Sequence, residues 1–216
     1  MISTITFLRE PLERMASEYE HFVRNYGYKG SLQDFYSRPV MHNRQSKILH
    51  GVDIEAIGML GLTECYGESL EVLNDCYGIE IPFREDNRGR QALRERHELS
   101  AEDMVGFKQL NTRDFELYKR VAALVEARLV LFDAGKPWAH PRLVETSASR
   151  VAGWAWWSGG SDEPVEVEIW INEELADTVP ALERRPGLCH LLPPRGGYVG
   201  FICRSNSNRV TRCDAE

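Results

Sequence analysis

Hydrophobic and polar positions follow the periods of strands and helices in the first part of the chain, up to about residue 135. The β-branched run 2–8 has the length of a buried strand. Pro11 stands where a first helical turn begins and its missing N–H costs nothing, and Gly27 has the position of a C-cap. Between them the apolar residues recur at spacings of three and four, which predicts an amphipathic helix: Leu12, Met15, Ala16, Tyr19, Phe22 and Val23.

Further strands and helices are predicted to follow in this part of the chain. A short helix is expected at 32–36, a second buried strand at 56–62 and a helix at 68–77. Capping-box patterns at 100–103 and 111–114 predict two more helix starts. Strands that alternate with helices favour an α/β layer with a parallel sheet. Two strands alone do not make a stable sheet, so we expect this region to be part of something larger. The last helix would share one face among Phe115, Tyr118, Ala122, Val125 and Leu129.

The later part of the chain has the alternating period of β-strands. Small or β-branched residues and tryptophans fall on alternate sides of a strand over 151–157, and valine and isoleucine alternate with glutamate and tryptophan over 165–171. The glycine pair 159–160 between these segments is a hairpin-type signal. Segments 198–203 and 208–212 would complete a small antiparallel sheet or sandwich. Trp154 and Trp156 share one side of a strand. Packing in the core is favoured for them over stacking on a sugar ring.

The change of period divides the sequence into two predicted domains. We expect an α/β domain over residues 1–134, a linker rich in glycine and proline over 135–144, and a β-sandwich module over 145–216.

Composition narrows the classes of function. The chain has 216 residues, of which 43% are hydrophobic and 27% charged, as in ordinary globular proteins. A net charge of −7 provides no overall basic field, so no nucleic-acid partner is expected. The sequence contains neither a run of about 18 apolar residues nor the pattern of a signal peptide, so we expect no transmembrane segment and a cytoplasmic location. Five cysteines without a C-x-x-C pair indicate neither a disulfide scaffold nor a metal site.

One segment carries candidate chemistry for binding an anion. A strand would deliver Arg9 to the carboxyl edge of the sheet, where the following helix also aims its free N–H groups. Ser17, six residues into that helix, would add a hydroxyl. Arg14 could be a second cation of the site, although we expect it to face solvent. The alternative is that Arg9 simply pairs with Glu10 or Glu13.

Residues 6–19 resemble the 3′-phosphate-binding motif of the Golgi-type carbohydrate sulfotransferases, in which a strand is followed by Leu-Arg-Asp-Pro-x-x-Arg-x-x-Ser-x-Tyr. The matching residues are Arg9 and Ser17, and Glu10 replaces the usual Asp. Three later segments resemble that family in order and spacing, so that the resemblance covers about residues 1–132: Asn43 to Gly51, Ile57 to Leu70 and Asn111 to Tyr118.

The resemblance implies a partial P-loop-like α/β domain of three layers, with few parallel strands. It implies transfer of a sulfuryl group from PAPS (3′-phosphoadenosine 5′-phosphosulfate) to a hydroxyl of a glycan acceptor, without a metal. Arg9 and Ser17 would hold the 3′-phosphate of PAPS or of the product PAP. The family's phosphosulfate-binding loop has no counterpart in the sequence. We therefore expect an N-terminally truncated protein that is inactive alone, with its catalytic base unassigned. The alternative is a non-catalytic glycan- or protein-binding protein with a degenerate sulfotransferase half.

Two further sets of residues are candidates for contact with a sugar. His42, Asn43, Gln45 and His50 could bind the acceptor, and the two histidines could act as bases, although a surface histidine without a role is the commoner case. Residues 145–205, with the pattern Gly-Trp-Ala-Trp, resemble a small β-sandwich module appended to bacterial glycan-modifying transferases. That resemblance implies an accessory role for the module.

Overall fold

The computed structural model describes residues 4–84, 99–147 and 149–204. The fold is mixed, with 49% helix and 25% strand. Two compact units divide the chain. The helical unit consists of Thr6–Val52 and Leu60–Leu129, and the β unit consists of the segment up to Ile5, Asp53–Met59 and the chain from Val130 onward.

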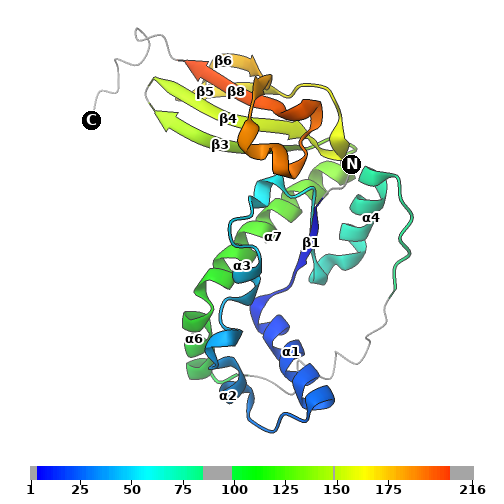
Figure 1. Cartoon of the computed structure of the whole chain (residues 1–216), viewed down its shortest axis with the longest axis vertical. Coiled ribbons are helices and arrows are strands. Elements are labelled where there is room, and N and C mark those ends of the chain that lie inside the picture. Colours follow the sequence, from blue (N-terminus) through cyan, green and yellow to red (C-terminus); the bar gives the residue numbers. More distant parts are fainter. Residues whose placement is uncertain (1–3, 85–98, 148, 205–216) are drawn as a thin grey trace. The chain divides into compact units, whose positions relative to one another are not determined.

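A small parallel sheet and several helices make up the first part of the structure (Figure 1). Strands β1 and β2 pair with each other, and they are the whole of this sheet within the described residues. The P-loop-like fold with three layers therefore remains an expectation. The elements are β1 (Ile5–Leu8), α1 (Pro11–Tyr26), α2 (Leu32–Tyr36), α3 (Arg44–Ile48), β2 (Met59–Leu62), α4 (Tyr66–Tyr77), α6 (Ala101–Leu110) and α7 (Thr112–Asp133).

The predicted ends of α1 and the start of α6 agree with the structure. Pro11 is the first residue of α1, and the Glu10 side chain accepts a hydrogen bond from the Glu13 backbone N–H. Gly27 closes α1 in the left-handed conformation, at φ 65°. The Ser100 hydroxyl caps α6 by accepting from a backbone N–H of its first turn.

The core of the helical unit is a cluster of aromatic and methionine side chains. Met15, Phe35 and Phe107 are fully buried there. Tyr36 meets Phe107 edge to face, with ring centroids 5.4 Å apart. Helix α7 buries Val125 as predicted, but its other buried residues each lie one position before a predicted one, and two of them are polar: Asp114, Val121 and Arg128.

The β unit contains two antiparallel sheets (Figure 1). One has the strand order β3-β4-β8-β7, and the other pairs β5 with β6. The strands are β3 (Ala139–Ser147), β4 (Arg150–Trp157), β5 (Glu166–Ile171), β6 (Glu174–Pro180), β7 (Glu183–Arg184) and β8 (Tyr198–Arg204).

Two sequence predictions for this unit were wrong. Residues 139–144 belong to strand β3 and not to a linker, and β3 pairs with β4. Pro141 indicated a linker, but proline is tolerated in an edge strand such as this one. The glycine pair 159–160 forms no hairpin, because β4 pairs with β3 and β8 while β5 pairs with β6. The strand predicted at 208–212 lies outside the described residues.

Strand β4 is buried on both of its faces. On one face Trp154 stacks on Trp156, with ring centroids 4.6 Å apart and planes 22° apart. Trp154 is only 2% exposed, which agrees with the predicted core role. On the other face Ala155 packs in a cluster with Phe201 and Ile169 of β5.

None of the helices in the described ranges is long and apolar enough to cross a membrane.

Candidate functional site

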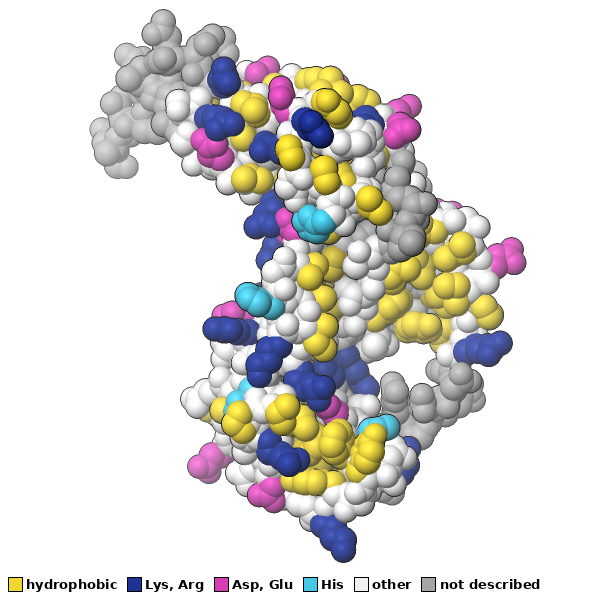
Figure 2. Space-filling model, viewed as in Figure 1, with side chains coloured by type: hydrophobic (Ala, Val, Ile, Leu, Met, Phe, Trp, Pro, Cys, Tyr) yellow, Lys and Arg dark blue, Asp and Glu magenta, His cyan; other side chains and the backbone are white. Residues whose placement is uncertain are grey.

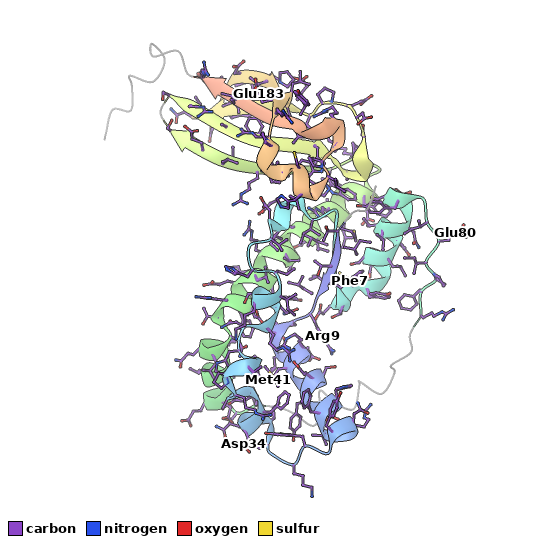
Figure 3. All side chains as sticks on the ribbon, viewed as in Figure 1. Phe7, Arg9, Asp34, Met41, Glu80 and Glu183 are labelled. Atoms are coloured by element: carbon purple, nitrogen blue, oxygen red, sulfur yellow. The ribbon has the colours of Figure 1, made fainter. Side chains whose placement is uncertain are left out.

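The predicted anion site lies where the chain leaves the carboxyl ends of the parallel strands. Arg9 and Glu10 follow β1 directly, and Figure 3 shows Arg9 at the junction of β1 and α1. Glu64 follows β2, and its Oε1 accepts a hydrogen bond from the Glu10 backbone N–H at 2.7 Å. This bond joins the two strand ends at the edge where α/β sheets bind ligands.

Gln45 holds the backbone of Arg9 from both sides. Its Oε1 accepts from the Arg9 N–H at 3.0 Å, and its Nε2 donates to the Arg9 carbonyl at 2.9 Å. The side-chain amide therefore acts like a short piece of neighbouring strand. Gln45 was a candidate for binding sugar, but its amide already serves this structural role.

Asn43 is also engaged within the protein. Its backbone N–H donates to Asn111 Oδ1 at 3.0 Å, and its side-chain Nδ2 donates to the Leu110 carbonyl at 3.1 Å. Its Oδ1 accepts from the Asp114 N–H at 3.2 Å. These bonds attach the start of α3 to the junction between α6 and α7.

Asp114 is a buried carboxylate that organises the same junction. Its side chain is fully buried. One oxygen accepts from the N–H and the hydroxyl of Ser46, both at 2.8 Å, and the other accepts from the Gln45 N–H at 3.2 Å. The capping box predicted for Asn111 and Asp114 is thus replaced by bonds to α3. The carboxylate lies at the N-terminal end of α3, where the helix favours negative charge.

Basic side chains gather close to this network. Figure 2 shows Lys and Arg side chains over the part of the helical unit where α1 and α3 begin. Arg14 and Arg44 both bond to the Glu18 carboxylate. Arg14 was expected to face solvent, but its side chain is only 17% exposed because it lies against Glu18. Two guanidinium groups thus share one carboxylate.

Arg9 precedes α1 and Ser17 lies within it, and the two side chains have different surroundings. The Arg9 guanidinium is 3.4 Å from the Glu13 carboxylate, as the alternative interpretation proposed. Ser17 is half-buried, one helical turn beyond Glu13, so the spacing places these two residues on one face of α1.

A carboxylate already caps the N-terminus of α1. The free N–H groups of the first helical turn were expected to attract an anion. One of them, the Glu13 N–H, instead donates a hydrogen bond to Glu10 Oε2 at 2.8 Å. Burial raises the pKa of Glu10 above its ordinary value, against the opposing effect of its backbone hydrogen bonds. The Glu13 N–H at this helix end is therefore already engaged by a carboxylate.

A tyrosine completes the edge beside Glu64. The pKa of Tyr118 is raised to about 12. Burial is the largest cause, and the negative charges of Glu64 and Glu10 add to it. Tyr118 comes from α7, so three elements contribute to this edge. Glu64 was not singled out from the sequence, although it lies in one of the segments that carry the resemblance.

The two candidate histidines differ. His50 is exposed, whereas His42 has a buried Nε2 that finds no hydrogen-bond partner among the described residues. In the same residues, no group of three or more His, Cys, Asp or Glu side chains could hold a metal ion.

No protein family matches the sequence, and neither a curated protein nor a solved structure does.

Proposed function

We propose that the helical unit binds the 3′-phosphate of PAPS or PAP through Arg9 and Ser17, as part of a sulfuryl transfer to a carbohydrate hydroxyl. One observation supports this proposal most strongly. The segments around Arg9, Asn43 and Asp114 carry the resemblance to sulfotransferases, and they bond to one another although 36 to 71 residues separate the bonded partners. If the resemblance had arisen by chance, there would be no reason to expect hydrogen bonds between the segments that carry it.

The chemistry of the proposed transfer is a displacement at sulfur. The acceptor oxygen forms a bond to sulfur while the bond from sulfur to the bridging oxygen of PAPS breaks. The leaving PAP takes the electron pair, and a base takes the proton of the acceptor hydroxyl. Within this reaction, the role proposed for Arg9 and Ser17 is to hold the nucleotide in place.

The local charges are compatible with such a ligand. The pair between Arg9 and Glu13 is long at 3.4 Å and partly exposed, so it is expected to be weak. A phosphate dianion offers Arg9 more charge and two acceptor oxygens in the geometry that a guanidinium prefers. Binding would therefore exchange Glu13 for phosphate.

Calorimetric titration of the full chain with PAP tests the proposal. Arg9→Ala should lower the affinity by about 10-fold to 100-fold, which corresponds to one hydrogen-bonded charge. Ser17→Ala should lower it less, because a neutral donor is lost. Arg24→Ala is the matched control, since Arg24 lies on the exposed last turn of the same helix.

Two results would count against the proposal. One is the absence of saturable heat with millimolar PAP on folded protein, which would favour the non-catalytic alternative. The other is an equal loss of affinity in Arg9→Ala and Arg24→Ala, which would indicate binding through general charge.

A further inference from the structure

One tryptophan of the β unit is placed unlike the others. The side chain of Trp170 on β5 is 58% exposed, whereas Trp138, Trp154 and Trp156 are buried and Trp157 is partly buried. An exposed indole leaves a large apolar surface in water, and such rings are common where a ligand binds.

The sheet formed by β5 and β6 presents Trp170 on its outer face. Val167 and Ile169 point the other way and pack against the core of the β unit. The Trp170 indole N–H donates to the Glu168 carboxylate at 2.9 Å, which limits the orientations of the ring. Leu175, the partner of Trp170 across the sheet, is also exposed and extends the apolar surface.

The hairpin around this ring is strongly acidic. Residues 166–180 contain five carboxylates and no lysine or arginine. Glu166 and Glu168 alternate with the inward residues of β5, so they share the outer face with Trp170. Glu173 and Glu174 lie at the turn, whereas Asp177 pairs with the inward Ile169 and accepts a hydrogen bond from Cys203 Sγ at 3.6 Å.

We propose that Trp170, together with Glu166 and Glu168 on its face and Glu173 and Glu174 at the turn, forms a binding surface for a glycan that carries protonated amino groups. The apolar face of a pyranose ring matches the flat indole, and an ammonium group is attracted both by the ring and by the carboxylates. The same charges repel sulfated or carboxylated glycans. This site lies in the β unit and does not rest on the function proposed for the helical unit.

A pair of matched oligosaccharides tests the inference on the full chain. The β-1,4-linked glucosamine tetramer carries four amines, and its fully N-acetylated form has the same rings without charge. Binding would be followed by calorimetry. We expect the amine form to bind at least 10-fold more tightly than the acetylated form, and to weaken as salt is added.

Three variants separate stacking from general charge. Trp170→Ala should weaken binding of the amine form by about 10-fold, whereas Trp170→Tyr should keep it within about threefold. Glu168→Gln should also weaken it. Leu182→Ala, which changes an equally exposed apolar residue of the β unit, should leave the affinity unchanged.

Three outcomes would overturn the proposal. The first is no binding of the amine form to folded wild-type protein. The second is equal affinity for the two tetramers. The third is unchanged affinity in Trp170→Ala, because binding would then reflect only the net charge of the protein.

Discussion

The two units hold their irregular segments in place by different physical means. In the helical unit the segment that contains α3 is fixed by hydrogen bonds to the buried carboxylate of Asp114 and to Asn111. In the β unit the 3-10 turn at Ile54–Ala56 is buried by packing, and Ala56 lies in a cluster with Trp154 and Trp156. The first arrangement consists of hydrogen bonds to buried polar groups. The second combines packing with a hydrogen bond from His140 Nδ1 to the Glu55 carbonyl and an ion pair between Arg142 and Asp53.

The two units are therefore expected to be sensitive to different kinds of substitution. A buried polar network loses stability when one partner is removed, because the remaining groups are then buried without hydrogen bonds. A packed aromatic cluster loses stability when a smaller side chain leaves a cavity. All five tryptophans lie between Trp138 and Trp170, in the β unit, so their fluorescence follows that unit, whereas helical circular dichroism mainly follows the other.

The largest expected effect comes from Trp154→Ala in the β unit. Removing this buried ring leaves a cavity beside Trp156 and should lower the free energy of unfolding by about 4 kcal/mol. Urea unfolding followed by the fluorescence of the remaining tryptophans measures the change. Trp170→Ala is the control, with an expected loss below about 0.5 kcal/mol because its ring is exposed. Equal losses in both variants would contradict the packing described for β4.

A somewhat smaller effect is expected from Asp114→Ala in the helical unit. The substitution leaves the backbone N–H groups of Gln45 and Ser46 without their acceptor, and should cost about 3 kcal/mol. The transition seen by helical circular dichroism should move to lower urea, while the fluorescence transition stays. If both transitions moved together, the two units would unfold as one and the comparison between them would fail.

The smallest effect is a shift in the titration of Tyr118. Its pKa of about 12 lies above the ordinary value near 10, so the folded state holds this proton more tightly than the unfolded state. The corresponding stability is present below pH 10 and is lost as the pH rises toward 12.

The difference in ultraviolet absorbance between wild type and Tyr118→Phe measures this titration directly. Glu64→Gln removes a like charge and should lower the pKa of Tyr118, though not to 10, because burial is the larger cause. A Tyr118 that titrates at pH 10 in the wild type would contradict the arrangement at this edge.

Local signals in the sequence predicted the local structure well. Pro11 and Gly27 mark the two ends of α1, and Ser100 marks the start of α6, because caps depend on neighbouring residues. Strand β3 was missed because almost all of its side chains are exposed and the strand lacks the expected alternation. Its place is decided by pairing with β4, which no local pattern contains.

The candidate site was predictable in its segments but not in its bonds. The resemblance singled out Asn43, Gln45 and Asp114, yet their roles as clamps depend on contacts across 36 to 71 residues. Arg14 and Glu18 are four residues apart on α1, but the bond from Arg44 to the same carboxylate spans 26 residues and is non-local. Sequence spacing placed Arg14 on the solvent side because it contains no information on where α3 packs.

The uncharged side chain of Gln45 fixes the backbone of a charged residue, Arg9, through two hydrogen bonds. An uncharged substitution at position 45 would remove both of these backbone bonds and leave every charge in the helical unit as it is. The backbone of Arg9 is therefore supported from helix α3, 36 residues away, independently of the charges that the arginines carry.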